Sequence, residues 1–453
     1  MGKEKPSRCN VLMFPWIAQG HFTPFLELAK ILSSRNFTVH FCSSPTILES
    51  IGKVIAKHHP NLSPSIHLVE LRLPSTPELP PHHHTTTALP PHLAGALQEA
   101  FQKTESTFYD IISAIDPDLL IYDAFQPWAA SQASSLNIPA VHLATTGAVA
   151  ISSLAHSRVD GVRGSKFPFP EIYYHDHEIR KFMAKKPAGI DLGDLGGLGF
   201  KSIQQSHKII FINSCREMEG KYVDYLSHLT KKEVMAIGPL IRQTSDEEDH
   251  AGITQWLQDK PESSCVLASF GSEYSMSRAE MEEIAFGLEI SGVNFIWVVK
   301  FPAGVATPAV EEAVPEGYLE RVKGRGIVVK GWVPQAKILA DKKICGFLSH
   351  CGWNSVFESL AFGVPIIALP LHLDQPGNAR LVEEIGVGVE AMKGENGEIK
   401  REEIAKALRK VAMEKSGEEM KKKARELSVK MRLSGEKMID EAVDKLIQLC
   451  RKN

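Results

Sequence analysis

The sequence contains no long apolar run, and no stretch approaches the roughly 18 consecutive apolar residues of a membrane-spanning helix. The N-terminal residues MGKEKPSRCN carry charges with no apolar segment behind them, so they do not have the pattern of a secretory signal. No charge of one sign dominates either, because 51 Lys and Arg stand against 54 Asp and Glu, for a net charge of -3. We therefore expect no membrane span and no nucleic-acid partner.

Paired cysteines are also missing. The 7 cysteines form no CxxC motif, and several of them lie in short apolar runs. A free thiol in such a run behaves as a small hydrophobic side chain. We therefore expect unpaired thiols and a reducing, cytoplasmic compartment.

Several catalytic signatures are absent as well. No G-x-G-x-x-G, P-loop or G-x-S-x-G motif occurs, which disfavours dehydrogenases, kinases and serine hydrolases. The D-x-D of residues 116–118 precedes a predicted strand instead of following one, so a turn explains it better. His175, His177 and Glu178 have no second ligand pair at usable spacing. We expect no metal ion.

The chain has 453 residues, 43% of them hydrophobic, which is enough for about two globular domains. Apolar runs alternate with helical patterns, as is typical of parallel sheets with helices on both faces. The polar segment 243–252 is the best linker candidate. We predict an α/β protein with domains over residues 1–242 and 253–433, and a final helix over 434–453 that packs back on the first domain.

The predicted elements follow from these patterns. Buried strands are expected at 9–14, 37–42, 67–71, 119–122, 140–143, 209–212, 265–270, 295–299, 326–329, 346–349 and 365–369. Helices are expected at 25–32, 97–115, 281–288 and 356–361. The acidic residues 246–249 and the basic run 421–423 have the pattern of solvated surface.

Two polar residues stand near the ends of predicted strands in the first half of the chain. His21 is expected in a loop after the first strand, where Thr23 and Pro24 open the next helix, and Asp123 follows the strand 119–122. The carboxyl ends of parallel strands share one edge, so these side chains could face one another. Two other interpretations stay open, because a lone histidine is usually structural and an aspartate often caps a turn.

The segment 332–375 has polar residues at several strand ends. The residues HCGWNS at 350–355 stand between a strand and a helix, so the backbone N–H groups near Asn354 and Ser355 form a helix N-terminus of the kind that binds phosphate. Gly352 lets a ligand approach the backbone, and His350 can add a hydrogen bond or a charge.

Other residues fit the rest of a nucleotide. Ser272, in the turn after another strand, could donate to the same diphosphate, and Glu358 lies one helical turn beyond Asn354, where it could accept from ribose hydroxyls. Trp332 offers a flat face for a base, with Gln335 beside it. Each residue also has a structural interpretation, with Trp332 in a core, Asn354 as a cap and Glu358 on the surface.

The ordered set resembles the signature of plant UDP-sugar-dependent glycosyltransferases. The matching positions are Trp332, Pro334-Gln335, His350 to Ser355, Glu358 and Asp374-Gln375. Gly20-His21 with Thr23-Pro24 is similar to the catalytic-histidine segment of this family, and Asp123 to its partner aspartate. The resemblance implies the GT-B fold, in which two Rossmann-like, doubly wound domains face each other across a cleft.

The resemblance also implies site roles for an inverting transfer. His21 would act as general base and Asp123 would orient it. Trp332, the Val333 main chain and Gln335 would bind uracil; Glu358 would bind ribose; Ser272, His350, Gly352, Asn354 and Ser355 would surround the diphosphate; Trp353, Asp374 and Gln375 would bind the sugar. The terminal Gln375 favours UDP-glucose as donor, although users of xylose, rhamnose and glucuronate carry it too.

The acceptor is expected to be a small-molecule glycoside. Residues 84–90 and 167–169 are similar to the branch of the family that extends a sugar already attached to a triterpenoid, lignan or flavonoid. The candidate acceptor-binding residues are Trp16, Phe125, Gln126, Thr145 and Thr146. The alternatives are a transferase that acts directly on an aglycone and a non-catalytic UDP-sugar-binding protein. We expect a monomer.

Overall fold

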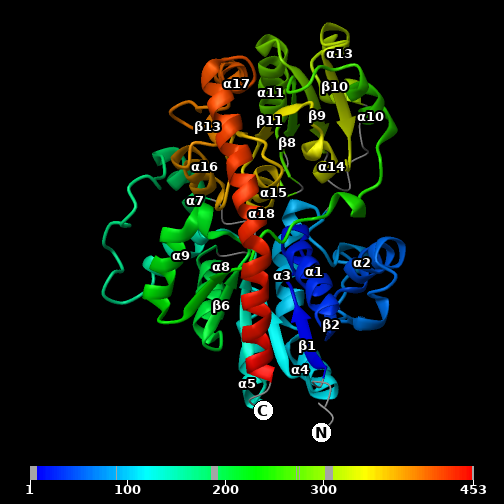
Figure 1. Cartoon of the computed structure of the whole chain (residues 1–453), viewed down its shortest axis with the longest axis vertical. Coiled ribbons are helices and arrows are strands. Elements are labelled where there is room, and N and C mark those ends of the chain that lie inside the picture. The colour runs from blue at the N-terminus through cyan, green and yellow to red at the C-terminus, as the bar shows by residue number, and fades with distance from the viewer. Residues whose placement is uncertain are drawn as a thin grey trace. The chain divides into compact units, whose positions relative to one another are not determined.

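The computed structural model describes residues 8–87, 89–184, 192–271, 273–274, 276–300 and 310–450. The chain divides into two compact units (Figure 1). Unit 1 consists of Met1–Ser165, Lys186–Ile241 and Ser434–Asn453, and unit 2 of Lys166–Lys185 and Arg242–Leu433. Residues 166–185 therefore group with unit 2, whereas we expected them in the first domain.

Unit 1 contains, among its described residues, a seven-stranded parallel sheet in the order β3-β2-β1-β4-β5-β6-β7. Its strands are β1 (Cys9–Phe14), β2 (Phe37–Ser43), β3 (Ile66–Glu70), β4 (Leu119–Tyr122), β5 (Ala140–Ala144), β6 (Ile209–Ile212) and β7 (Glu233–Ala236). Its helices are α1 (Gln19–Ser34), α2 (Pro45–His58), α3 (Ala94–Gln102), α4 (Glu105–Ile115), α5 (Pro127–Ser135), α6 (Ala148–His156), α8 (Leu192–Gln205) and α9 (Arg216–Thr230). The order reverses between β1 and β4, which makes the sheet doubly wound.

Unit 2 contains, in the part of the chain that the structure describes, a six-stranded parallel sheet in the order β10-β9-β8-β11-β12-β13. Its strands are β8 (Cys265–Ser269), β9 (Asn294–Val299), β10 (Gly326–Lys330), β11 (Ile344–Ser349), β12 (Ile366–Ala368) and β13 (Gly388–Glu390). Its helices are α7 (Asp176–Ala184), α10 (Ala251–Gln258), α11 (Arg278–Ser291), α12 (Val310–Ala313), α13 (Tyr318–Arg321), α14 (Gln335–Ala340), α15 (Trp353–Ala361), α16 (Gln375–Glu384) and α17 (Arg401–Ala412). Here the order reverses between β8 and β11.

All the strands that we expected are present, with small shifts of their ends, and β7 and β13 are additional. Two helix predictions are wrong. Helix α1 begins at Gln19, so His21 lies in its first turn and Pro24 lies inside the helix, where proline costs a backbone hydrogen bond but is tolerated. The expected helix 97–115 is two helices, α3 and α4, separated at Lys103 and Thr104.

The charged runs are not uniformly solvated, which corrects a second expectation. Glu247 is buried, accepts a hydrogen bond from the Lys337 backbone N–H at 3.0 Å and lies 4.0 Å from Arg242. Lys421 is buried as well, and its ammonium donates to Glu418 at 2.8 Å. These partners offset only part of the cost of burying a charge, because burial still raises the pKa of Glu247.

The last helix, α18 (Lys415–Cys450), belongs partly to each unit (Figure 1). In unit 2, Ser428 donates to the carbonyl of Ala361. In unit 1, apolar residues at helical spacing enter the same core cluster as β1, namely Ile439, Ala442, Val443, Leu446 and Leu449. No helix within the described residues is both long enough and apolar enough to cross a membrane.

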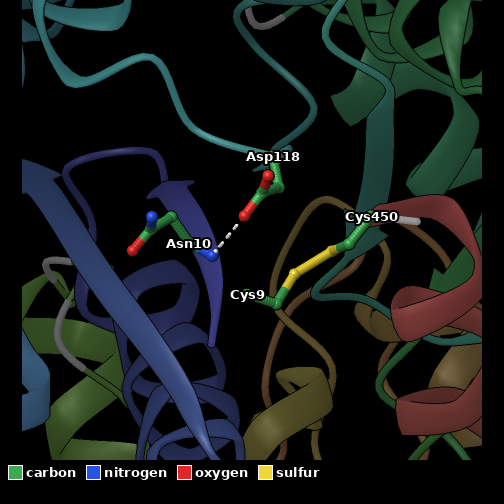
Figure 2. Close-up of a disulfide and its surroundings, with 4 residues drawn as sticks. All are labelled: Cys9, Asn10, Asp118 and Cys450. Carbon is green, nitrogen blue, oxygen red and sulfur yellow. Dashed lines mark hydrogen bonds between the residues drawn. A yellow bond between two sulfur atoms is a disulfide. The ribbon is translucent and has the colours of Figure 1, made fainter. Parts of the chain in front are cut away.

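Cys9 and Cys450 form a disulfide between the start of β1 and the end of α18 (Figure 2). Our expectation of unpaired thiols is therefore wrong for this pair, because the two residues are separated by 441 positions in sequence and no local motif marks them. Beside the disulfide, Asp118 accepts a hydrogen bond from the backbone N–H of Asn10 at 2.7 Å. The D-x-D thus has a structural role at this end of β1.

Thiol titration tests the disulfide. The other five cysteines are free and buried. Protein purified without reductant and then denatured should therefore show five reactive thiols, and after reduction all 7. The variant Cys450→Ser should show six in both states, because Cys9 loses its partner. Seven thiols in the unreduced wild type would contradict the bond.

Candidate active site

Both sheets gather polar residues at the point where their strand order reverses. In unit 1, His21 follows β1 and Asp123 follows β4, and these strands are neighbours. In unit 2, Gly271 follows β8 and His350 follows β11, which are neighbours as well. In open α/β sheets ligands bind at this topological switch point, outside the carboxyl ends of the strands.

The structure brings His21 and Asp123 together. Nδ1 of His21 lies 2.8 Å from a carboxylate oxygen of Asp123 and 3.0 Å from the hydroxyl of Thr145. The side chain of His21 is 24% exposed, whereas that of Asp123 is fully buried. A carboxylate at Nδ1 favours the tautomer with the proton on that nitrogen, which leaves the ring's lone pair on Nε2.

Asp123 is held as a carboxylate although it is buried. Burial by itself raises its pKa, but the charge and hydrogen bond of His21 and the backbone N–H groups of Trp16 and Ala124 outweigh burial, so the pKa of Asp123 is lowered. The two N–H groups donate at 3.0 Å and 2.7 Å. These contacts fix the carboxylate in position, and the carboxylate in turn orients the imidazole of His21.

Aromatic side chains border this pair. The Phe125 ring centroid lies 5.5 Å from that of His21, and the ring of Trp16 packs edge-on against Phe125 and Phe101. Thr146 is partly exposed next to the buried Thr145. Of the residues expected to bind an acceptor, Gln126 is fully buried and its amide donates to the carbonyl of Phe14 at 2.6 Å. Gln126 therefore supports β1 instead of offering surface to a ligand.

In unit 2, His350 lies between two glycines. A Cβ atom on Gly271 would lie 2.5 Å from Nε2 of His350, and one on Gly352 would lie 2.6 Å from the same atom. Any other residue at either position would push the ring aside, and Gly271 also has φ +77°. Burial, and then the charge of Lys300, lower the pKa of His350 to about 4. The imidazole is therefore neutral at pH 7.

Helix α15 begins at Trp353, three residues after His350, with Gly352 as its N-cap. The backbone N–H groups of Trp353, Asn354 and Ser355 are those of the first turn, the kind that binds anions. The Trp353 ring is buried and stacks on Phe357 with centroids 5.4 Å apart. Ser272, which we expected to join this group, lies outside the described residues.

Trp332, which follows β10, is 53% exposed. Val333 beside it is buried. The amide of Gln335 donates to the carboxylate of Glu358 at 2.6 Å, which links the first turn of α14 to α15. Gln335, which we expected at the uracil, and Glu358, which we expected at the ribose, are thus in direct contact.

Asp374 and Gln375 begin α16. The carbonyl oxygen of the Gln375 side chain accepts from the backbone N–H groups of Leu371 and His372 at 2.9 Å and 3.0 Å. These two donors fix which end of the amide is oxygen, so the amide nitrogen remains to donate. Asp374 accepts from the amide of Asn378 at 3.1 Å.

A buried ion cluster joins residues 166–185 to α16. Arg380 donates to Glu178 at 3.1 Å and also pairs with Glu390, while its guanidinium lies 4.7 Å from the ring centroid of Tyr173. The carboxylate of Glu178, which the sequence analysis considered as a metal ligand, therefore forms an ion pair with Arg380. No group of three or more His, Cys, Asp or Glu within the described residues could hold a metal ion.

Sequence reasoning missed two of these features. Lys300 follows β9 at the same sheet edge, and the charge of Arg380 is buried in unit 2. The position of Lys300 directly after a predicted buried strand could have indicated that it lies at this sheet edge. No local sequence pattern indicated the burial of Arg380, because its partner Glu178 is 202 positions away in the sequence.

Two doubly wound parallel sheets, one in each unit, are the domains of the GT-B fold of glycosyltransferases, which confirms the fold prediction. Medicago truncatula UGT71G1 complexed with UDP-glucose superposes with a TM-score of 0.77 at 26% sequence identity, over 97% of this chain and 98% of that one. The family model described as "Glycosyltransferase, N-terminal domain" matches residues 7–242, and the one described as "UDP-glucoronosyl and UDP-glucosyl transferase" matches residues 228–443. The chain therefore belongs to the family of UDP-sugar-dependent glycosyltransferases and is a UDP-glycosyltransferase.

Two relatives illustrate the similarity. Mogroside IIIx synthase of Siraitia grosvenorii is 50% identical over 448 residues, which cover 98% of each chain. Flavanone 7-O-glucoside 2''-O-beta-L-rhamnosyltransferase of Citrus maxima is 42% identical over 459 residues, which cover 100% of this chain and 99% of the relative.

Proposed function

We propose that the chain transfers glucose from UDP-glucose to a hydroxyl of a plant specialised-metabolite glycoside, with inversion at the anomeric carbon. The observation that carries this proposal is the contact of His21 with Asp123 at 2.8 Å, at the switch point of a doubly wound sheet. A protein that only binds UDP-sugars has no need of a histidine oriented by a buried carboxylate. A general base does.

In the proposed reaction, Nε2 of His21 takes the proton of the acceptor hydroxyl. The acceptor oxygen attacks the anomeric carbon on the face opposite UDP. The new C–O bond forms as the bond to the β-phosphate oxygen breaks, and UDP leaves with the bonding electrons, so the configuration inverts. Asp123 stabilises the imidazolium that results, because its carboxylate stays ionised at Nδ1.

We assign the donor to the carboxyl edge of the sheet in unit 2. The assigned contacts are uracil on Trp332 with the Val333 main chain and Gln335, ribose on Glu358, the diphosphate at Ser272, His350, Gly352, Asn354 and Ser355, and the sugar at Trp353, Asp374 and Gln375. The first-turn N–H groups of α15 supply hydrogen bonds to the diphosphate, so the assignment requires no metal ion. The amide nitrogen of Gln375 would donate to a sugar hydroxyl.

We assign the acceptor to Trp16, Phe125, Thr145 and Thr146 around His21. The loop with the sequence pattern of sugar-extending transferases lies next to this surface, because Thr86 N–H and the Thr85 hydroxyl both donate to the carbonyl of Ile17, at 3.1 Å and 3.2 Å. The Citrus maxima relative is, by its name, an enzyme that acts on a glucoside. Both observations support a glycoside acceptor over a bare aglycone.

We further propose that the enzyme acts as a monomer in the cytoplasm, where reducing conditions would keep Cys9 and Cys450 as thiols and their disulfide would form on oxidation. The balanced charge gives no electrostatic reason for association with membranes. Light scattering of the purified chain would test the first part, and microscopy of a fluorescent fusion the second.

A product panel tests the function. The protein is incubated with UDP-glucose, UDP-xylose, UDP-rhamnose or UDP-glucuronate and with pairs of acceptors, each a glycoside and its aglycone. We expect mass spectrometry to show hexosyl addition with UDP-glucose on the glycosides, and NMR to show a β-linkage. Addition to aglycones alone would favour direct aglycone glucosylation, and UDP binding without any product would refute the proposed catalysis.

A further inference from the structure

Lys300 borders both halves of the proposed donor site. It is the first residue after β9, and β9 lies between β10, which leads to Trp332, and β8, which leads to Gly271. Its ammonium lies 5.1 Å from the ring centroid of Trp332. Its charge also acts on the imidazole of His350 and lowers the pKa of that ring. One cation thus stands near the residues assigned to the base and to the diphosphate.

The ammonium of Lys300 is half-buried without an acidic partner. Burial lowers its pKa, and no neighbouring acid offsets that effect. Among the described residues no carboxylate pairs with Lys300, and residues 301–309 contain no aspartate or glutamate. Arg242, whose guanidinium lies 5.2 Å from the same ring of Trp332, has Glu247 at 4.0 Å. A half-buried cation without a counterion is costly, and a bound anion removes that cost.

The other donors around the assigned diphosphate carry no full charge. The imidazole of His350 is neutral, because its pKa is about 4. The first turn of α15 offers N–H groups, which carry only the partial charge of a helix end. UDP carries several negative charges and gains one more when the sugar leaves. Lys300 can supply the full positive charge that these donors lack.

We propose that Lys300 binds the diphosphate of the UDP-sugar and stabilises UDP as the leaving group. This inference rests on the proposed function, because it takes the donor to lie along the carboxyl edge of this sheet. The simplest alternative is that Lys300 only packs against Trp332 and supports the stacking face. The two roles can be distinguished by comparing the binding of UDP with that of uridine, because UDP has a diphosphate and uridine has none.

Calorimetric titration of the full chain with UDP and with uridine tests the proposal. Lys300→Met should weaken UDP binding by about 10- to 100-fold, as expected for the loss of a charge-assisted hydrogen bond, and leave uridine binding nearly unchanged. Lys300→Arg should restore most of the UDP affinity. The matched control is Lys323→Met, an exposed lysine of the same unit, which changes the net charge equally and should alter neither affinity.

Equal losses for UDP and uridine would show that Lys300 only supports Trp332, and an unchanged UDP affinity would remove it from the site; either result overturns the proposal. Thermal melting checks that the variants fold, and Lys300→Gln replaces Lys300→Met if the latter does not. Failure of the proposed function would look different, because the wild type would then bind UDP without transferring sugar.

Discussion

Replacing His21 by alanine should lower kcat for glycosyl transfer by about 10²- to 10⁴-fold, which is the usual contribution of a general base. The affinity for UDP should stay unchanged, because all the residues assigned to UDP belong to unit 2 and His21 belongs to unit 1. Since the His21 side chain is partly exposed, its removal should not unfold the protein. Initial rates at saturating UDP-glucose and calorimetric titration with UDP measure the two quantities.

Two control variants sharpen this experiment. His67→Ala removes an exposed histidine of β3 in the same unit and should change neither quantity. Thr145→Val removes the hydroxyl that lies 3.0 Å from Nδ1 of His21, and should reduce kcat much less than His21→Ala. Retention of most of the activity in His21→Ala, or an equal loss of UDP affinity, would mean that another group takes the proton.

Replacing Arg380 by methionine should lower the free energy of unfolding of unit 2 by about 3–5 kcal/mol, the usual effect of removing one partner of a buried ion pair. The side chain of Arg380 is 1% exposed and lies between the carboxylates of Glu178 and Glu390. Without it both carboxylates are buried without a cation. Hydrogen exchange of the amides in β12 and β13 under increasing urea reports this loss locally, since β13 ends at Glu390.

The size of the effect should depend on pH. Burial raises the pKa of Glu390 to about 7 even with Arg380 present. A carboxyl with a raised pKa in the folded state favours folding below that pKa and loses this contribution as pH rises through it. Without Arg380 the pKa rises further, so the defect of Arg380→Met should be smaller at pH 5 than at pH 8.

A surface arginine provides the comparison. Arg278→Met breaks the exposed pair with Glu282 in the same unit, which should cost only about 0–1 kcal/mol and show little dependence on pH. If the two variants are equally stable, the cluster around Arg380 does not contribute to the stability of unit 2.

Local patterns predicted the parts of this protein that depend on local chemistry. Strands such as β4 and β6 were correct to the residue, because four consecutive buried apolar side chains leave few alternatives. The helix predicted at 281–288 is α11, which begins three residues earlier at Arg278, where Ser277 and Glu280 form a capping box. In contrast, β13 has only three residues and no apolar run, so its pairing with β12 was not visible in the sequence.

Long-range contacts explain what was missed. The position of Asp123 beside His21 followed from the shared edge of a parallel sheet, but the orientation of the ring depends on Trp16 and Ala124, whose N–H groups fix the carboxylate. Pro24 suggested a helix start that lies earlier in the chain. Residues such as Arg380 have the sequence pattern of surface, and only partners elsewhere in the fold account for their burial.

The shared helix α18 sets an order for folding during synthesis. Unit 1 contains the first strand of the sheet, yet its core also needs Ile439 to Leu449, which the ribosome delivers only after all of unit 2. The unit that begins to emerge first is therefore completed last. Until then its core lacks one covering helix and exposes apolar surface to chaperones and proteases. Truncations or fusions near Cys450 should consequently disturb the domain that carries His21, although these residues are far apart in sequence.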